Sequence, residues 1–364
     1  MADKIATREA YGKSLAKLGE KYKNFVVLDA DLAEATKTAY FKEAFPDRFF
    51  DCGIAEGNMM SVAAGIATTG KTVFASSFAM FAAGRAFEQV RNSIGYPHLN
   101  VKIGATHAGV TVGEDGATHQ CLEDIALMRT IPGMTVINPA DAVEAAAAVE
   151  AAINIDGPVY MRFGRYAVPV INDNEGYKFQ VGRGVEVRKG SDVTVVATGI
   201  MVSMALEAAE ALAAEGISVR VVNIHTIKPI DREIIAAAAR ETGAIVTAEE
   251  HNIIGGLGSA VAEVVGEECP VPVLRVGVKD EFGHSGKVPP LLEMYGLTPA
   301  KIVEAVKKAV ALKKSCVTGE VKCLSRISNF DLSVCSQSLC KAPSGRELAR
   351  NATEGARATK SFAP

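Results

Sequence analysis

The chain has 364 residues, of which 48% are apolar and 22% are charged, and its formal net charge is −3. This composition is typical of a globular protein with two or three domains and excludes a disordered or fibrous chain. The charge gives no attraction to nucleic acid or to an anionic membrane, and no run of about 18 apolar residues predicts a membrane span. Because charges occur throughout residues 1–18, we expect an amphipathic helix there rather than a signal peptide, and a cytoplasmic protein.

Up to residue 166, short apolar runs alternate with stretches of helical periodicity. This alternation predicts strand–helix–strand units on a parallel sheet. Strands are predicted at 25–28, 48–51, 72–75, 101–104, 135–137 and 158–161, and helices at 5–18, before Pro46, and at 57–68, 81–93, 122–129 and 140–153.

Residues 167–184 contain Pro169, Asn174 and Gly176 without a clear element, which favours a linker. The alternation then returns, with strands predicted at 193–197, 219–222, 244–247 and 273–276 and helices at 202–214, 231–240, 258–265 and 299–312. We therefore expect an α/β protein with two doubly wound, mostly parallel domains at 1–166 and 185–312. In such domains the sites lie at the carboxyl ends of strands.

Residues 313–364 differ from the rest, because they hold nine Lys or Arg against four acidic residues and four of the seven cysteines. The cysteine spacings are irregular, and no histidine follows His284, so a zinc site is not expected. We predict an irregular tail that is disordered or foreign to the fold.

A polar, glycine-rich loop runs from His107 to His119 directly after a predicted strand. Loops in this position hold ligands in α/β proteins. His107, Glu114, Asp115 and His119 can form hydrogen bonds or carry protons. The alternative is a surface loop whose glycines only serve turns, and residue types alone leave both interpretations open.

Glu56 lies between an apolar strand end and a helix rich in Gly, Ala and Met. A carboxyl group buried there suits proton exchange with a bound base, whereas a carboxylate at a helix start is also favoured by the helix dipole alone. Phe78 and Phe81 are one helical turn apart, which fits either core packing or an aromatic wall for a planar ligand.

Two further histidines lie beside predicted strands. His251 precedes Gly255-Gly-Leu-Gly-Ser259, which opens a predicted helix, and free N–H groups at a helix start suit an anion. However, Glu249 and Glu250 would repel phosphate, so we favour a structural role for His251. For His225 we expect a loop or interface position.

Several motifs occur together in the order found in transketolases. They are ADL (30–32), GIAE (53–56), FAMFAAG (78–84), the upstream His107 with VGEDGATHQ (112–120), RTIPGM (129–134), NPAD (138–141) and YMR (160–162). The sequence resembles the C-terminal half of a transketolase over roughly residues 5–312. The loop motif is the most specific part, while the second domain is shared with related thiamine-dependent enzymes.

The resemblance implies a role for each matching residue. Glu56 matches the glutamate that hydrogen-bonds the aminopyrimidine ring of thiamine diphosphate. Phe78 and Phe81 match its hydrophobic pocket, and Asp31 matches a residue at the cofactor-binding subunit contact. The remaining matches concern sugar substrates: His107, Asp115 and His119 match groups that contact the hydroxyls of the donor and handle protons as its carbon–carbon bond breaks, and Arg162 matches a contact to the phosphate of the acceptor. The resemblance thus implies that Glu56, His107 and His119 are catalytic.

One departure from the family pattern is informative. Transketolases bind the diphosphate and Mg²⁺ through a GDG motif in an N-terminal domain, and this chain has no GDG. The resemblance therefore implies a split transketolase of the pentose phosphate type, which carries no metal ligands itself. It would act on sugar phosphates with an N-terminal partner subunit, as a self-associating α₂β₂ assembly, and would be inactive alone.

Two alternatives remain open. One is a subunit of the 1-deoxyxylulose-5-phosphate synthase or 2-oxo acid dehydrogenase beta type, against which the acids Glu114 and Asp115 between His107 and His119 argue. The other is a non-catalytic binding module, which predicts loss of the site residues, whereas Glu56, His107, Asp115, His119 and Arg162 are all present.

Overall fold

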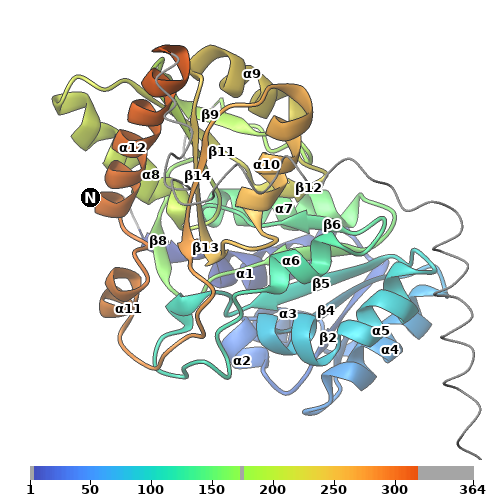
Figure 1. Ribbon diagram of the computed structural model, residues 1–364. Helices are drawn as coiled ribbons and strands as arrows, with labels where there is room; N and C mark the ends of the chain where they lie inside the picture. The colour runs from blue at the N-terminus through green and yellow to red at the C-terminus, as the bar shows by residue number, and fades with distance from the viewer. Residues whose placement is uncertain (1–3, 173–175, 319–364) are drawn as a thin grey trace, which may run out of the picture. The chain divides into compact units, whose positions relative to one another are not determined.

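Two mostly parallel sheets with helices on both faces organise the chain (Figure 1). The computed structural model describes residues 4–172 and 176–318. The predicted α/β class with doubly wound, mostly parallel sheets is confirmed.

The first sheet has seven strands in the order β12-β6-β7-β5-β4-β2-β3, and only β12 runs antiparallel to its neighbour. The strands are β2 (Phe25–Asp29), β3 (Phe49–Asp51), β4 (Thr72–Phe78), β5 (Val101–Thr106), β6 (Thr135–Ile137), β7 (Val159–Arg162) and β12 (Thr226–Lys228). In β4, Phe74 packs into one core while Val73 and Ala75 pack into the other, because successive side chains point to opposite faces.

Helices cover both faces of this sheet. The core around Phe74 contains residues of α1 (Thr7–Lys21), α3 (Ala39–Ala44) and α7 (Ala142–Ile153). The core around Val73 contains residues of α4 (Glu56–Ala67) and α6 (Asp124–Arg129). The short α2 (Ala33–Thr36) and the 3₁₀ turn η1 (Pro46–Arg48) join β2 to β3.

The helix predicted at 81–93 is irregular in the structure. Two π-helical segments, η2 (Met80–Arg85) and η3 (Val90–Gly95), flank the single turn α5 (Phe87–Gln89). The small residues Ala82, Ala83 and Gly84 allow the wide turn, and a Cβ atom at Gly84 would lie only 2.3 Å from Cε of Met80. Widened turns of this kind occur frequently at functional sites.

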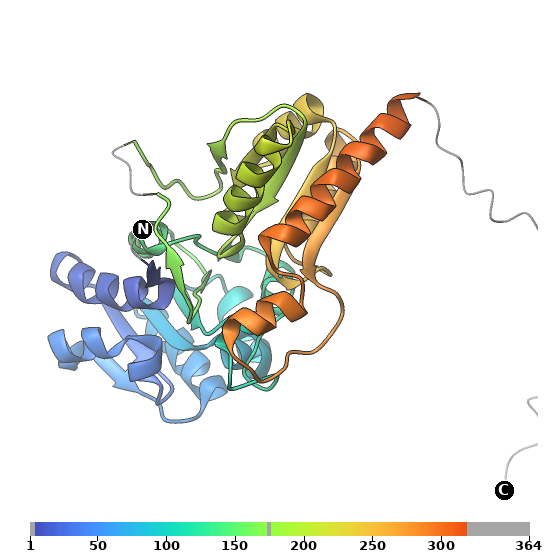
Figure 2. The ribbon, with the colours of Figure 1, turned by 90° about the vertical axis from the view of Figure 1, so that its left-hand side faces the viewer.

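The second sheet has five strands in the order β14-β13-β10-β11-β9, with β9 antiparallel to β11. Helices α8 and α12 pack on one face, as Figure 2 shows, and α9 and α10 on the other. The elements are β9 (Val185–Arg188), β10 (Val193–Ala197), α8 (Met201–Ala214), β11 (Val219–Asn223), α9 (Arg232–Thr242), β13 (Ile245–Asn252), α10 (Leu257–Glu268), β14 (Val273–Val278), α11 (Val288–Met294) and α12 (Pro299–Thr318).

The two halves are interleaved more than the sequence predicts. Strand β12 comes from the second half but completes the first sheet, and β8 (Ala167–Pro169), at the start of the predicted linker, pairs with β1 (Lys4–Ala6). One apolar cluster contains residues of both halves, and residues 1–314 form one compact unit. The predicted boundaries near 166 and 185 remain predictions.

Helix α12 continues beyond the predicted helix end at 312 and reaches Thr318. The predicted irregular tail therefore begins within this helix, and its remainder from 319 lies outside the described residues. No helix in the described part of the chain combines the length and hydropathy needed to cross a bilayer.

Candidate active site

The predicted site residues follow neighbouring strands of the first sheet at their carboxyl ends. Phe78 ends β4, His107 follows β5, Asp31 follows β2 and Arg162 ends β7. Strands β7, β5, β4 and β2 are adjacent and parallel, so their carboxyl ends meet at one edge of the sheet.

Glu56 is the first residue of α4 and is only 2% exposed. Its Oε2 accepts a hydrogen bond of 2.9 Å from Nη1 of Arg85, whose side chain is 53% exposed. The Arg85 guanidinium also lies 4.5 Å from the centre of the Phe81 ring. The arginine compensates a buried carboxylate that would otherwise be costly. Arg85 was not predicted, although its place four residues after Phe81 puts both on one helical face.

Aromatic rings connect Glu56 to the glycine-rich loop. The rings of Phe78 and Phe81 are stacked 5.9 Å apart, and Phe78 stacks on His107 at 3.8 Å. His119 meets Phe81 edge to face at 5.3 Å. The structure thus brings Glu56, Phe78, Phe81, His107 and His119 together, although the sequence separates the first and last by more than 60 residues.

His107 is held in one tautomer. Its side chain is 3% exposed, with Nε2 3.1 Å from Nη1 of Arg8 and Nδ1 2.9 Å from Oγ1 of Thr106. Burial, reinforced by the positive charge of Arg8, lowers the pKa of His107 to about 3. Since Arg8 can only donate, Nε2 accepts and the proton lies on Nδ1, which donates to Thr106. The backbone of His107 has a φ of +56°, a conformation rare for a residue other than glycine.

The histidine loop (residues 107–120) carries the other predicted polar groups. His119 is partly buried, and its Nδ1 lies 2.9 Å from Oγ1 of Thr118. The Asp115 carboxylate is exposed and lies 3.6 Å from Nη1 of Arg165. The same guanidinium donates to the carbonyl of Val112 and lies 3.7 Å from the Glu114 carboxylate.

The surroundings of Arg162 do not favour the predicted phosphate contact. Arg162 is 3% exposed, its Nε donates to Asp124 at 2.8 Å, and its Nη2 donates to the carbonyl of Glu250 at 2.9 Å. These bonds commit Nε and Nη2 of Arg162 to partners in the protein interior. Arg165, three residues further on and partly exposed beside Asp115, is the guanidinium that an incoming anion could reach. The sequence offered only a weak signal for Arg165, namely its position three residues after the end of the same strand.

Asp31 lies apart from the aromatic cluster. It is exposed, has a φ of +62°, and its N–H donates to Oδ1 of Asp51 at 3.1 Å. Buried Asp29 fixes this loop by accepting hydrogen bonds from Thr36, Thr38 and the Leu32 N–H, and burial raises the pKa of Asp29 to about 6. Among the described residues, no hydrogen bond or ion pair joins Asp31 to Glu56.

The helix start after His251 is occupied by a carboxylate of the chain itself. Glu249 accepts hydrogen bonds from the N–H groups of Leu257 and Gly258, and burial raises the pKa of Glu249 to about 7. His251 is fully buried beside it, and His225 is buried 4.3 Å from the ring of Phe179. These contacts are structural, as we favoured for His251.

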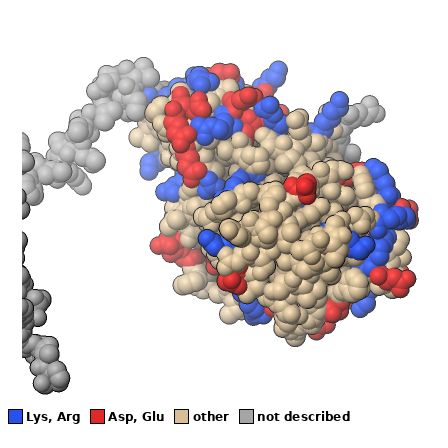
Figure 3. All heavy atoms as spheres, turned by 90° about the vertical axis from the view of Figure 1, so that its right-hand side faces the viewer, with Lys and Arg blue, Asp and Glu red and all other residues tan. Residues whose placement is uncertain are grey.

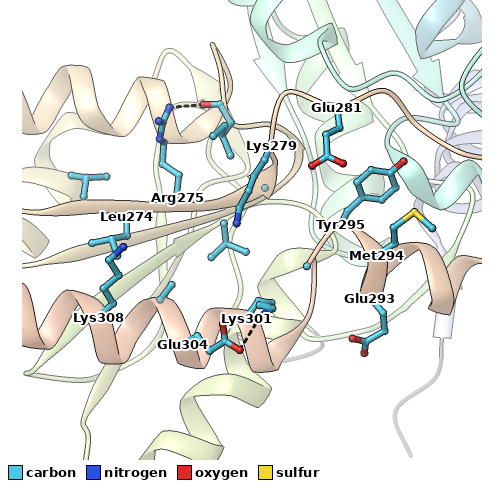
Figure 4. Close-up of a pocket in the computed structure, with 16 residues that line it drawn as sticks. Leu274, Arg275, Lys279, Glu281, Glu293, Met294, Tyr295, Lys301, Glu304 and Lys308 are labelled. Atoms are coloured by element: carbon cyan, nitrogen blue, oxygen red, sulfur yellow. Dashed lines mark hydrogen bonds and ion pairs between the residues drawn. The ribbon is translucent and has the colours of Figure 1, made fainter.

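Of two cavities in the described chain, one borders the histidine loop and the other does not. A cleft of about 480 Å³ lies beside the end of the histidine loop, and its lining includes Met80, Thr118, Gln120, Glu123 and residues 280–283. A larger cavity of about 590 Å³ lies between β14, α11 and α12 (Figure 4). Lys279 points into it, but none of the predicted site residues lines it. Nowhere in residues 4–172 and 176–318 do three or more His, Cys, Asp or Glu side chains form a potential metal site.

Comparison with known proteins identifies the class to which this fold and site belong. Residues 3–170 match the model of the transketolase pyrimidine-binding domain, and residues 182–302 match that of the transketolase C-terminal domain. The chain therefore belongs to the transketolase family.

Its relatives include separate C-terminal sections. The chain is 51% identical over 307 residues to a putative transketolase C-terminal section of Methanocaldococcus jannaschii, covering 83% of this chain and 96% of that protein. It is 46% identical to the 6-deoxy-6-sulfo-D-fructose transketolase subunit SqwH of Clostridium sp. strain MSTE9, covering 84% and 95%. Mouse transketolase is 43% identical, with 85% of this chain and 50% of the mouse protein covered.

Among solved structures, a split gene transketolase described as an inactive beta4 tetramer is 58% identical, with a TM-score of 0.80. The match covers 85% of this chain and 99% of that one. The chain thus corresponds to nearly the whole of separate transketolase sections and to half of mouse transketolase. It is similar to separate sections or subunits over most of their length, and to part of a longer transketolase.

Proposed function

We propose that this chain is the C-terminal subunit of a split, thiamine diphosphate-dependent transketolase that transfers a two-carbon ketol unit between sugar phosphates. The observation that supports this most is the cluster of Glu56, Phe78, Phe81, His107 and His119 at one sheet edge. A planar cofactor ring and a sugar can both be bound there, in a protein whose relatives are transketolase sections.

Glu56, Phe78 and Phe81 fit the aminopyrimidine ring of thiamine diphosphate. Arg85 holds Oε2 of Glu56, and no described residue donates a hydrogen bond to Oε1, so one carboxylate oxygen is available to an aminopyrimidine nitrogen. Phe78 and Phe81 supply an apolar wall next to it. When bound, thiamine diphosphate supplies the nucleophilic carbon for ketol transfer. Glu56 acts on the ring, and Asp31 contributes to the cofactor-binding subunit contact.

The histidine loop binds the sugar. His119 and Asp115 are accessible and accept or donate hydrogen bonds to the donor hydroxyls. His107 stays neutral and presents an imidazole fixed by Arg8 and Thr106. We assign the phosphate contact to Arg165 in place of Arg162, since a partly exposed guanidinium suits a dianion.

The diphosphate and Mg²⁺ bind to a separate N-terminal subunit. In Figure 3, the face on the right-hand side of Figure 1, where α4 and α5 lie, carries few charged side chains in its lower half. Ile54, next to α4, is 77% exposed, and Val62 within α4 is 37% exposed. Such a face favours a protein contact, and α4, which lies on it, begins at Glu56. We propose an α₂β₂ complex in the cytoplasm, where sugar phosphates occur.

A sulfonated ketose is a second candidate donor. One relative, 46% identical, is named for 6-deoxy-6-sulfo-D-fructose. A sulfonate is an anion that an exposed arginine such as Arg165 binds as it binds phosphate. Comparing kcat/KM for fructose 6-phosphate and for the sulfonated sugar in the reconstituted complex decides between the two donors.

The variant Glu56→Ala tests the cofactor assignment. In the complex with the N-terminal subunit, the loss of this group should lower transfer at least ~100-fold while leaving assembly intact. Glu207→Ala, an exposed glutamate on α8, is the matched control and should keep full activity. Unchanged turnover in Glu56→Ala would refute the assignment.

A further inference from the structure

The histidine loop is attached to the second half of the chain at its beginning, middle and end. At its beginning, Oε1 of Glu250 on β13 accepts a hydrogen bond of 2.7 Å from the N–H of Thr111. Glu250 is only 5% exposed, and it fits against Gly109, where a Cβ atom would lie 2.1 Å from the same oxygen. The carboxylate and the loop backbone are therefore in close contact.

The middle and the end of the loop contact the segment between β14 and α11. The hydroxyl of Ser285 donates to the carbonyl of Glu114, and Nε2 of Gln120 donates to the carbonyl of His284 at 2.9 Å. Gly283 leaves room for Gln120, since a Cβ atom at position 283 would lie 1.8 Å from Oε1 of Gln120.

The histidine loop needs contacts with the second half of the chain because its glycines allow its backbone many conformations. Gly109, Gly113 and Gly116 all have positive φ angles, and glycines lose more conformational freedom on ordering than other residues. The bond from Thr111 to Glu250 is a charge-assisted hydrogen bond in a buried place, which is among the stronger kinds. Arg162 donates to the backbone of Glu250 and to Asp124, and so ties β7 to β13.

We propose that Glu250 is a positioning residue, which together with the His284–Gln120 contact holds the histidine loop in the conformation that binds the donor sugar. This gives the C-terminal half a role in the reaction although it contributes none of the predicted catalytic groups. The role in sugar binding rests on the proposed function, whereas the attachment itself is a property of the isolated chain.

Hydrogen–deuterium exchange on the isolated full chain tests the attachment without any activity. In Glu250→Ala, amides of residues 109–120 should exchange at least ~10-fold faster, because Thr111 loses its acceptor. Glu250→Gln retains an acceptor oxygen and should restore most of the protection. Lys279→Ala, an exposed residue in the same part of the chain, should leave the loop unchanged.

Steady-state kinetics of the complex with the N-terminal subunit tests the consequence. In Glu250→Ala the donor KM should rise about tenfold with thiamine diphosphate affinity unchanged, and Glu250→Gln should recover the KM. Gly283→Ala displaces the Gln120 amide and leaves Glu250 in place, and it should also raise the donor KM. If Glu250→Ala does not fold, the donor KM of Gly283→Ala tests the proposal.

The outcomes separate this inference from the proposed function. Unchanged loop exchange in folded Glu250→Ala, or an unchanged donor KM in both Glu250→Ala and Gly283→Ala, would overturn it. Equal losses of cofactor affinity and sugar affinity would also overturn it, because they indicate a general structural defect. Faster loop exchange with no transfer by the wild-type complex would refute the proposed function and leave the attachment standing.

Discussion

At the scale of single residues, the candidate site combines buried polar groups with more accessible ones. Glu56 and His107 are almost fully buried, and each is bonded to an arginine, Arg85 and Arg8. Asp115 and His119 are more accessible. The buried pair is suited to orienting a cofactor and shaping the pocket, and the accessible pair to exchanging hydrogen bonds with successive sugars.

His107 should remain neutral throughout the physiological pH range. Its pKa is about 3 in the folded chain against about 6.5 in an unfolded one. The unfolded chain therefore takes up this proton first, and the contribution of His107 to stability is lost as the pH falls below about 6.5. NMR of the chain labelled at histidine ¹³Cε1 should show no titration of the His107 signal between pH 5 and 8. The signal is assigned with His107→Gln, and a midpoint near pH 6.5 would contradict this account.

Arg162 and Arg165 should respond differently to the same substitution. Arg165→Ala should raise the KM for a sugar phosphate about 10- to 100-fold and leave the unfolding free energy nearly unchanged, because it removes an accessible cation. Arg162→Ala leaves Asp124 buried without its cation and should lower the free energy of unfolding by about 3–5 kcal/mol. The measurements are steady-state kinetics of the complex and urea unfolding of the isolated chain. The reverse pattern would restore the phosphate role to Arg162.

The sequence predicted most residues of the candidate site, but not the arginines that pair with Glu56 and His107. Glu56, Phe78 and the two loop histidines were found because their motifs are contiguous. Arg8 and Arg85 were missed because their roles depend on contacts that form only in the folded chain. Arg8, for example, contacts His107, which lies 99 residues away in the sequence. The assignment of Arg162 rests on its position in a motif, which carries no information on burial, and the phosphate contact of either arginine remains a prediction.

At the scale of elements, several helices begin at a carboxylate that binds their free N–H groups. Asp141 accepts from Glu144 at the start of α7, and Asp231 accepts from Ile234 at the start of α9. For α10 the carboxylate comes from another element, since Glu249 lies on β13. A carboxylate near a helix N-terminus is favoured by the helix dipole as well as by the hydrogen bonds.

Removal of this last contact should destabilise the second sheet. Glu249→Ala leaves the N–H groups of Leu257 and Gly258 buried without an acceptor and should lower the free energy of unfolding by about 2–4 kcal/mol. Glu233→Ala, an exposed glutamate on α9, is the control. Urea unfolding followed by circular dichroism measures both, and equal stability of Glu249→Ala and wild type would show that this contact contributes little.

Periodicity predicted the central strands and the long helices, but not the short elements at the margins. The three-residue strands β1, β8 and β12 were not predicted, and each pairs with a segment far away in the sequence: β1 with β8, and β12 with a strand about 90 residues earlier. Residues 81–93 are mostly helical, as predicted. Their π-helical turns depend on packing around Gly84, which no local sequence pattern indicates.

At the scale of the whole molecule, the proposal is that the chain contains one part of an active site that it shares with a second subunit. Glu56 is the first residue of α4, which lies on a face with few charged side chains. Two relatives that match this chain over nearly their whole length are described as a transketolase C-terminal section and a transketolase subunit, and a solved relative is described as an inactive beta4 tetramer. These findings agree with the proposal that activity requires a second kind of chain.

The most direct test measures ketol transfer by the purified chain alone, by the N-terminal subunit alone and by their mixture. Each sample contains thiamine diphosphate, Mg²⁺, a ketose phosphate donor and an aldose phosphate acceptor. We predict transfer only in the mixture, rising with added partner until the two chains are present in equal amounts. Transfer by this chain alone, or no transfer by a stable stoichiometric complex, would contradict the central claim.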